Sequence, residues 1–434
     1  MLERQFRIRA SGSTVGREVT AGVTTFLTMA YIIFVNPDIL GAAGMDRGAL
    51  ITATILAAAF GTLVSGLWAN VPFAMAPGMG LNAFFAFSLV IGRQVTWQTA
   101  LGVVFVSGVI FLVLTLVGVR RHVVAAIPEE MRLAIPAGIG LFITFIGAQK
   151  LGLIVASEAT LVALGPLTVP VVLGLTGLLL IAVLEIRKVK GAILIGIAAT
   201  TALGVALGEV AMPATLVDAP PSLAPVFLQM DLAGALKWGM WGAIFSFMFV
   251  DLFDSVGTIV ACSYEADLVR EDGTFERIDR VLEADALATI AGSVLGTSTT
   301  TTYIESGAGI AEGGRTGLAN VVTALLFLAA LVVTPLIAVV PGFATAPALI
   351  MVGVAMFRNV SRIDFSRLDV AVPVFLTIIL MPLTYSISMG LAFGFLASIA
   401  ARVAAGRART VHPVMWGIGA ISALEIAVSA AGTG

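Results

Sequence analysis

The sequence predicts an all-α polytopic membrane protein, and three features of its composition support this class. Of its 434 residues, 59% are hydrophobic and only 12% are charged, and the mean hydropathy is +1.05. Too few polar side chains remain to cover the surface of a soluble globular protein of this length. The net charge of -2, without any basic block, gives no reason to expect nucleic acid as a partner. The single cysteine, Cys262, excludes a disulfide framework within the chain, and we expect neither a metal nor a cofactor.

Fourteen apolar stretches are predicted to span the membrane, if a crossing takes about 20 residues and fewer where Gly or Pro interrupts it. They lie near residues 19–37, 50–69, 72–91, 98–119, 133–148, 168–186, 191–208, 238–262, 285–296, 299–312, 317–340, 345–357, 370–385 and 387–405. The proline-rich linker 209–237 separates a first repeat of seven spans (19–208) from a second (238–405). A tail at 406–434 follows, in which the apolar run 415–431 is either an interfacial helix or an extra crossing. We favour the interfacial helix.

The distribution of Lys and Arg predicts the orientation of the spans, because these residues collect on cytoplasmic connections. Basic residues precede the first span and follow the fourth, sixth, eighth, tenth, twelfth and fourteenth spans, whereas the opposite connections carry only Arg47, Arg93, Lys150 and Lys237. The N-terminal segment 1–18 and the C-terminus are therefore both predicted to be cytoplasmic, and the linker is predicted to be extracytoplasmic.

Two spans at matching positions in the repeats are interrupted. With seven spans in each half, the halves enter the membrane from opposite sides, which is the inverted repeat of many secondary transporters. The third span contains VPFAMAPGMGLNAFFAF (71–87) and the tenth contains GTSTTTTYIESGAGIAEGG (296–314). Non-helical backbone at membrane depth is tolerated only where protein or a watery cavity satisfies its polar groups. Close packing of Gly-rich helices could explain either segment alone, but not their matched positions. The pair therefore predicts a substrate site between the repeats.

Apart from Glu185 and Glu312 at the ends of two spans, four acidic residues lie within predicted spans: Asp251 and Asp254 in the eighth, Asp285 in the ninth and Glu305 in the tenth. An ionisable side chain at such a depth costs roughly 2.5 to 3.5 kcal/mol, so it is a candidate functional residue by default. Asp251 and Asp254 share a helix face and would repel one another if both were charged, so one of the group is expected to carry a proton part of the time. A proton-coupled carrier needs this property. Hydrogen bonding inside a helix bundle is an equally good explanation for Asp251.

Asn82, which follows Pro77, Gly78 and Gly80, offers both donors and acceptors to a ligand. Phe84 and Phe85 beside it could stack on a flat ring, although core or lipid packing would also explain them. Weaker candidates for the wall of the site are Thr25, Thr28, Tyr303 and Ile304.

Carboxylates accept hydrogen bonds and repel anions, so a site with Asp254 and Glu305 suits a neutral, N–H-rich solute or a cation. Two alternatives remain open at this point. An anion exchanger of the same architecture would require a site without carboxylates. An intramembrane aspartyl protease would require two acids beside a GxGD-like turn, and no such turn occurs in the sequence.

Four motifs together resemble the AzgA-type purine permeases over nearly the whole chain. They are GREVTAGVTTFLTMAYIIFVNP (16–37), APGMGLNAFFAF (76–87), FDSVGT (253–258) and YIESGAGIAEGGRTGL (303–318). The resemblance implies a proton symporter of the cell membrane that imports hypoxanthine, guanine or adenine and is often a homodimer. It also implies a seven-plus-seven inverted repeat with core and gate domains. In that fold the third and tenth spans contribute short antiparallel strands around the substrate.

Within this resemblance, the substrate-binding residues of the family correspond to Asn82, Asp254 and Glu305. Thr258, one turn beyond Asp254, occupies a position that faces the ligand in related carriers. Asp254 stands where uracil and xanthine carriers have a glutamate, and its shorter side chain leaves more room for a purine. FDSVGT looks somewhat more like the guanine and hypoxanthine branch than the adenine branch. Proton coupling is expected from Asp254, Glu305 and Asp251.

Overall fold

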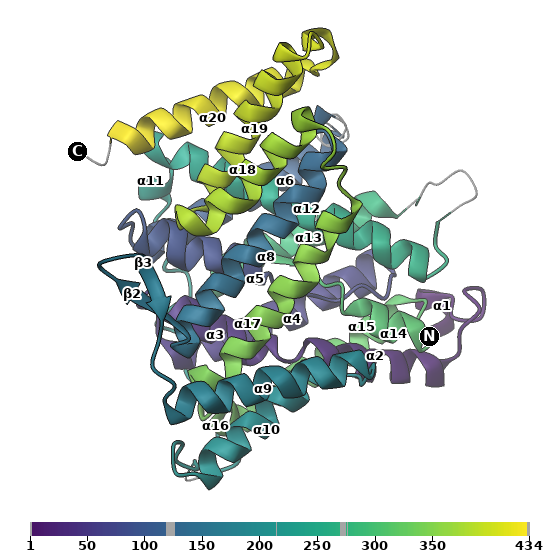
Figure 1. Cartoon of the computed structure of the whole chain (residues 1–434). Helices are drawn as coiled ribbons and strands as arrows, with labels where there is room; N and C mark the ends of the chain where they lie inside the picture. The colour runs from purple at the N-terminus through teal and green to yellow at the C-terminus, as the bar shows by residue number, and fades with distance from the viewer. Residues whose placement is uncertain (1, 119–125, 214, 270–274, 276, 432–434) are drawn as a thin grey trace.

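The computed structural model describes residues 2–118, 126–213, 215–269, 275 and 277–431, which are mostly helical (Figure 1). The helices of the first half are α1 (Leu2–Phe6), α2 (Val15–Met29), α3 (Ile32–Gly41), α4 (Arg47–Val64), α5 (Met79–Ala83), α6 (Trp97–Leu116), α8 (Glu129–Leu151), α9 (Val169–Ile186) and α10 (Ala192–Ala206). Those of the second half are α11 (Leu232–Ala235), α12 (Trp241–Glu265), α13 (Ile278–Leu295), α14 (Ser306–Ala311), α15 (Gly317–Ala330), α16 (Thr334–Ala338), α17 (Gly342–Phe357), α18 (Leu368–Leu383), α19 (Ile387–Ala404) and α20 (Pro413–Ala431). The strands are β1 (Met75–Pro77), β2 (Ile154–Ser157), β3 (Leu161–Leu164) and β4 (Thr300–Thr302).

Nine helical stretches of the described residues are long and apolar enough to cross a membrane. They are Val15–Gly41, Arg47–Ala69, Trp97–Leu116, Glu129–Leu151, Val169–Ile186, Trp238–Glu265, Gly317–Ala338, Gly342–Arg362 and Ile387–Ala404. Shorter apolar helices lie at the predicted third, seventh and thirteenth spans. The predicted ninth span was too short. Helix α13 begins at Ile278 and not at residue 285. The prediction left out its first two turns because they carry the charged residues Asp279, Arg280 and Glu283, which are typical of a loop.

The two interrupted spans meet in an antiparallel strand pair. Met75 lies opposite Thr302, and Pro77 lies opposite Thr300. The pairing continues beyond the strands, because the N–H of Tyr303 donates to the Ala74 carbonyl over 2.9 Å and that of Gly78 donates to the Thr299 carbonyl over 2.9 Å. The β-branched threonines of β4 favour extended backbone. In β1, Pro77 disfavours helical backbone at the residue before it, which keeps Ala76 extended. The short antiparallel strands that the resemblance implied are thus present.

Helix contacts divide the described chain into two bundles. The first, here called the strand bundle, contains α2–α6 and α12–α15 packed around β1 and β4. The second, here called the outer bundle, contains α8, α9, α10, α17, α18 and α19, with α8 and α17 in close contact along their lengths. Helix α20 packs on α19.

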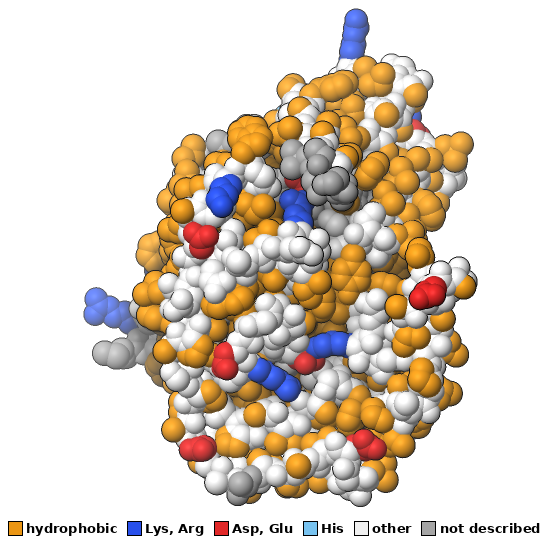
Figure 2. Space-filling model, turned by 90° about the vertical axis from the view of Figure 1, so that its left-hand side faces the viewer, with side chains coloured by type: hydrophobic (Ala, Val, Ile, Leu, Met, Phe, Trp, Pro, Cys, Tyr) orange, Lys and Arg blue, Asp and Glu red, His pale blue; other side chains and the backbone are white. Residues whose placement is uncertain are grey.

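The sequence did not predict the small hairpin that follows α8. A hairpin of β2 and β3 follows α8, with Ile154 opposite Leu164, and its second strand is exposed. Figure 1 shows the hairpin on the same side of the molecule as the C-terminus, whereas the N-terminus lies on the opposite side. Seen from the hairpin side, the surface carries single charged side chains of both signs among uncharged ones (Figure 2).

A close backbone approach joins α15 to the turn after α4. A Cβ atom on Gly66 would lie 2.7 Å from the carbonyl oxygen of Gly317 and 2.8 Å from Cβ of Asn320. Asn320 donates from its amide to the Phe73 carbonyl over 2.8 Å and so ties α15 to the segment that leads into β1. Small residues at such contacts let helix backbones approach closely in a membrane.

We therefore expect Gly66→Ala to destabilise the protein, because the new methyl group meets a backbone oxygen that cannot move alone. Overpacking of this kind costs about 1 to 3 kcal/mol. The thermal midpoint of the detergent-solubilised protein measures the loss. Gly417→Ala in α20 is the control, since its Cβ would meet nothing within 4 Å. Equal midpoints for both variants would contradict this account of the packing.

Candidate functional site

The candidate site lies where α12 passes the strand pair. Helix α12 contacts β4, α14 and α5, so residues from the eighth, tenth and third predicted spans converge there. Strands β1 and β4 run antiparallel, and each leads directly into a short helix, α5 and α14 respectively. The break of each span therefore ends in a helix that begins inside the protein.

Glu305 occupies the turn between β4 and α14 and is half-buried. Its carboxylate accepts a short hydrogen bond from the Tyr31 hydroxyl, and its backbone carbonyl lies 3.3 Å from the Thr28 hydroxyl. Both partners belong to the first span, at the end of α2 and the turn into α3. The first span therefore fixes both the side chain and the backbone of this acid.

Asp254 lies on α12 and is half-buried, with Thr258 one turn further along the helix. Asp254 and Glu305 come from elements that pack together, because α12 contacts α14, the helix that begins directly after Glu305. The two elements that carry the acids singled out by the sequence are therefore neighbours in the fold. Two neighbouring carboxylates disfavour an anion between them and favour a shared proton or a donor-rich ligand.

Asn82 lies on α5 and is completely buried, with 0% of its surface exposed. Neither its amide nitrogen nor its amide oxygen has a hydrogen-bond partner among the described residues. A buried donor or acceptor without a partner costs about 1 to 3 kcal/mol, so buried polar groups in native proteins are nearly always paired. An amide left in this condition beside a broken span is suited to pair with a ligand.

A second polar cluster lies behind β4 and contains the remaining acids. Asp285 accepts hydrogen bonds from Ser255 over 2.8 Å and from Thr302 over 3.2 Å. Asp251 is buried, and its carboxylate lies 3.4 Å from the Thr289 hydroxyl. The hydroxyls of Ser255 and Thr301 are 2.6 Å apart, so this cluster joins α12 and α13 to the strand. Asp251 and Asp254 therefore have different surroundings, although the sequence placed them on one helix face.

The other predicted wall residues differ in their surroundings. Phe84 is only 1% exposed and packs on Phe247 with ring centroids 4.6 Å apart, and Phe85 is also buried, which is the core packing that the sequence allowed as an alternative. Tyr303 donates to the Pro77 carbonyl over 2.5 Å and so ties the two broken spans together. Ile304, by contrast, is 53% exposed. Thr25 is buried.

The sequence reasoning missed Tyr31 and Asn36. Both are polar residues in the apolar run TMAYIIFVNP, and this was the available signal. Asn36 donates to the hydroxyls of Thr54 over 2.7 Å and Thr297 over 2.9 Å, so it fixes the entry to β4. Neither could be assigned a partner from sequence, because each partner is remote in the chain or in another helix.

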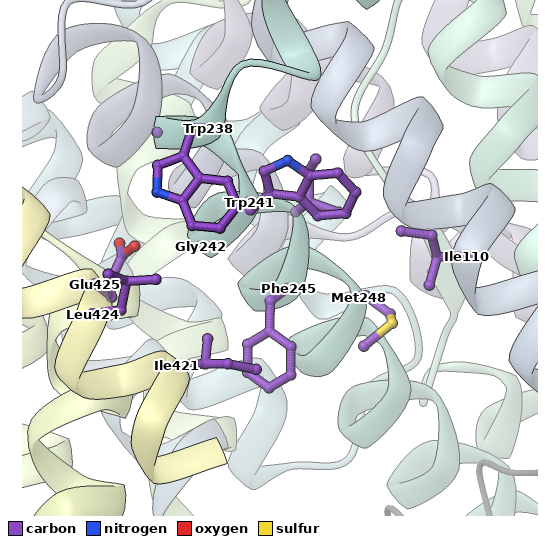
Figure 3. Close-up of a pocket in the computed structure, with 11 residues that line it drawn as sticks. Ile110, Trp238, Trp241, Gly242, Phe245, Met248, Ile421, Leu424 and Glu425 are labelled. Atoms are coloured by element: carbon purple, nitrogen blue, oxygen red, sulfur yellow. The ribbon is translucent and has the colours of Figure 1, made fainter. Parts of the chain in front are cut away.

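An apolar groove among the described residues lies away from these acids. It has a volume of about 350 Å³ and is lined by residues of α12, α6 and α20, among them Trp238, Trp241, Phe245 and Met248 (Figure 3). Its walls are almost wholly apolar, and Glu425 is its one acid. The groove does not include Asn82, Asp254 or Glu305.

Known proteins resemble this chain in both sequence and fold. Putative permease MJ0326 of Methanocaldococcus jannaschii is 48% identical over 425 residues, covering 98% of each chain. Adenine permease AdeP of Escherichia coli is 46% identical over 95% of this chain and 93% of its own length. Guanine/hypoxanthine permease PbuG of Bacillus subtilis is 44% identical over 95% of this chain and 96% of its own.

Among solved structures, the transmembrane domain of the cyanobacterial bicarbonate transporter BicA matches with a TM-score of 0.63 at 16% identity, over 90% of this chain and 97% of that one. SLC26A9 matches with a TM-score of 0.65 at 10% identity, over 90% of this chain and 66% of that one. At such identities the likeness concerns the fold alone.

The helices that can cross a membrane, the resemblance of the sequence to named nucleobase permeases and the fold shared with membrane transporters agree with one another. The family model described as "Permease family" (Xan_ur_permease) matches residues 16–393. The chain is therefore a multi-pass membrane protein that belongs to this permease family, a family of transporters and not of enzymes.

Proposed function

We propose that the protein is a proton-coupled symporter that imports purine nucleobases across the cell membrane, with guanine or hypoxanthine as the first candidates and adenine as a further one. The observation that carries the proposal is the buried, unpartnered amide of Asn82 on one broken span, paired with a second broken span in which Glu305 begins a short helix packed against α12, the helix of Asp254. A purine presents ring nitrogens and N–H groups at its edge. One amide and two carboxylates supply the complementary acceptors and donors.

The named relatives support the class of substrate. AdeP is named an adenine permease and PbuG a guanine/hypoxanthine permease, and both match almost the whole chain. The solved anion transporters share only the fold, and the pair of acids at this site opposes an anionic substrate. In this proposal the base is contacted by Asn82, Asp254, Glu305 and Thr258. The wall of the site is completed by Tyr303, Ile304, Phe84 and Thr28. The proton is bound and released by Asp254, Glu305 and Asp251.

The architecture proposed for this activity has fourteen crossings in two inverted repeats, 19–208 and 238–405. In it, the strand bundle corresponds to the core domain and the outer bundle to the gate domain. The N-terminal segment 1–18 is cytoplasmic, the linker 209–237 is extracytoplasmic, and the protein forms a homodimer. The two bundles defined by helix contacts support this division, because the residues proposed to bind substrate lie mainly in one of them.

Replacing either acid should abolish most of the uptake. Asp254→Asn and Glu305→Gln keep the shape of the side chain but remove its charge, and a hydrogen bond to a charged group contributes about 1.5 to 3 kcal/mol. We expect initial uptake of labelled hypoxanthine or guanine to fall about 10- to 100-fold, as 1.4 kcal/mol corresponds to a factor of ten. Asp364→Asn is the control, because Asp364 is exposed and bonds only Ser366 nearby. Normal uptake by both Asp254→Asn and Glu305→Gln would rule the proposal out.

Asn82→Leu should separate stability from binding. The substitution removes a buried amide that has no partner, so the thermal midpoint without ligand should stay equal or rise. The additional rise that hypoxanthine, guanine or adenine gives the unchanged protein should disappear. Asn36→Leu is the matched comparison, since it removes two observed hydrogen bonds and should lower the midpoint. Retained stabilisation by a nucleobase in Asn82→Leu would remove Asn82 from the site.

Proton coupling predicts a limit on accumulation. One proton moving through about 100 mV supplies roughly 2.3 kcal/mol, which sustains a concentration ratio of about 50-fold. Vesicles with an imposed gradient should concentrate labelled hypoxanthine up to this order. A protonophore should return the ratio to unity, whereas dissipating a sodium gradient should leave it unchanged. Accumulation that survives the protonophore would contradict a proton symporter.

A further inference from the structure

Helix α20 is apolar and has the length of a membrane crossing. Its 19 residues correspond to about 28 Å at 1.5 Å per residue, close to the thickness of a bilayer's hydrocarbon core. Glu425 is its one charged residue. At 7% exposure, this acid would be costly at such a depth without a partner.

Helix α20 lies antiparallel along α19. Near its start, a Cβ atom on Gly419 would meet Ile399, in the last turns of α19. Further along α20, Glu425 contacts Arg93, which also contacts Ser388 in the first turn of α19. A helix on the bilayer surface would lie across the ends of the spanning helices, whereas α20 follows α19 from one end to the other. Figure 1 accordingly shows the C-terminus on the side of the molecule away from the N-terminus.

The shared partner is Arg93, which pairs with Glu425 and also donates to Ser388 over 3.3 Å. Arg93 follows the third span, which carries Asn82, and therefore belongs to the strand bundle. Ser388 and Glu425 belong to α19 and α20, on the side of the outer bundle. The ion pair thus joins the two bundles.

Two landmarks place this ion pair at the extracytoplasmic end. The positive-inside pattern assigns Arg93 to that side. Figure 3 shows Glu425 beside Gly242, in the first turn of α12 directly after the linker 209–237, with Trp238 and Trp241 nearby. Exposed tryptophans are enriched at both membrane–water interfaces and so indicate the depth of the pair, while the predicted extracytoplasmic side of Arg93 and of the linker assigns it to the outer interface.

A second contact of the same kind lies at the same end. Lys150, at the end of α8, forms an ion pair with Asp38 of α3 and donates to its backbone carbonyl over 2.9 Å. The hydroxyl of Thr345 in α17 donates to Asp38 over 2.7 Å. Here too one partner lies in the strand bundle and the others lie in the outer bundle, so two separate polar contacts hold the bundles together at this face.

We propose that α20 is a fifteenth crossing, which puts the C-terminus outside the cytoplasm, and that Arg93 and Glu425 form a clasp that closes the outer face between the bundles. The clasp is formed in the conformation described here. It must open when the bundles move relative to each other, and this opening rests on the proposed transport function. This topology replaces the expectations of an interfacial helix at 415–431 and of a cytoplasmic C-terminus.

Tag accessibility in intact cells tests the crossing without any assay of transport. An epitope fused after the last residue should bind antibody on intact cells, whereas the same epitope at the N-terminus should bind only after permeabilisation. If both epitopes required permeabilisation, α20 would not be a crossing and the proposal would fail.

A charge exchange tests the clasp. Arg93→Glu and Glu425→Arg should each lower the thermal midpoint by several degrees and reduce uptake, since each leaves like charges in contact. The double variant should recover most of both losses, because it restores the pair in reverse. Arg367→Gln with Asp369→Asn, an exposed surface pair, is the control and should change the midpoint little.

A double variant no better than the single ones, in the thermal midpoint as well as in uptake, would overturn the clasp. The midpoint and the tags report on the clasp and the crossing even if the protein transports another solute. Their outcome is therefore independent of the substrate proposal.

Discussion

The structure depends on the antiparallel pairing of β1 with β4. Extended backbone inside a membrane protein exposes N–H and C=O groups that lipid cannot satisfy. Two broken spans solve this problem only together, because each strand supplies the partners that the other lacks. The additional bonds from Tyr303 to Ala74 and Pro77 extend the pairing into the turn that presents Glu305. The strand pair therefore fixes the position of one half of the site relative to the other.

Side chains of the surrounding helices support this pair from several directions. Thr62 donates to the Met75 carbonyl over 2.9 Å, Ser306 accepts from the N–H of Ala74 over 3.0 Å, and Thr289 lies 3.0 Å from the Thr300 carbonyl. Such hydroxyls are small enough to lie within tightly packed helices, yet they satisfy the backbone at the ends of the strands. Other buried polar atoms nearby also lack a partner, among them the hydroxyls of Thr299 and Thr300, but among the described residues Asn82 alone leaves two polar atoms unpaired, and this is why it points to a ligand.

The polar contacts between the bundles have a different character. Inside the strand bundle, hydroxyls donate to backbone carbonyls and to the carboxyl groups of Asp285 and Glu305, and these bonds hold a fixed arrangement. Between the bundles at the outer face, the contacts are the ion pairs of Arg93 with Glu425 and of Lys150 with Asp38. Arg93, Lys150 and Asp38 are partly exposed, so water can take over their hydrogen bonds when the bundles separate. A strong but replaceable contact suits a boundary that opens and closes.

The amino-acid sequence alone was enough to predict the membrane class and the positions of the two breaks and to select the acids of the candidate site, because hydropathy, Gly and Pro, and charge within apolar runs are local properties of the chain. It also placed Asn82, Asp254 and Glu305 together through a family resemblance, and the structure brings α5, α12 and α14 into contact. Only the tertiary structure decided that Asp251 belongs to the cluster of Asp285 and not to that of Glu305. It also decided that Tyr31 bonds Glu305 across 274 residues of chain and that α20 lies along α19. Such pairings depend on which helix faces meet in space, and no local pattern records this.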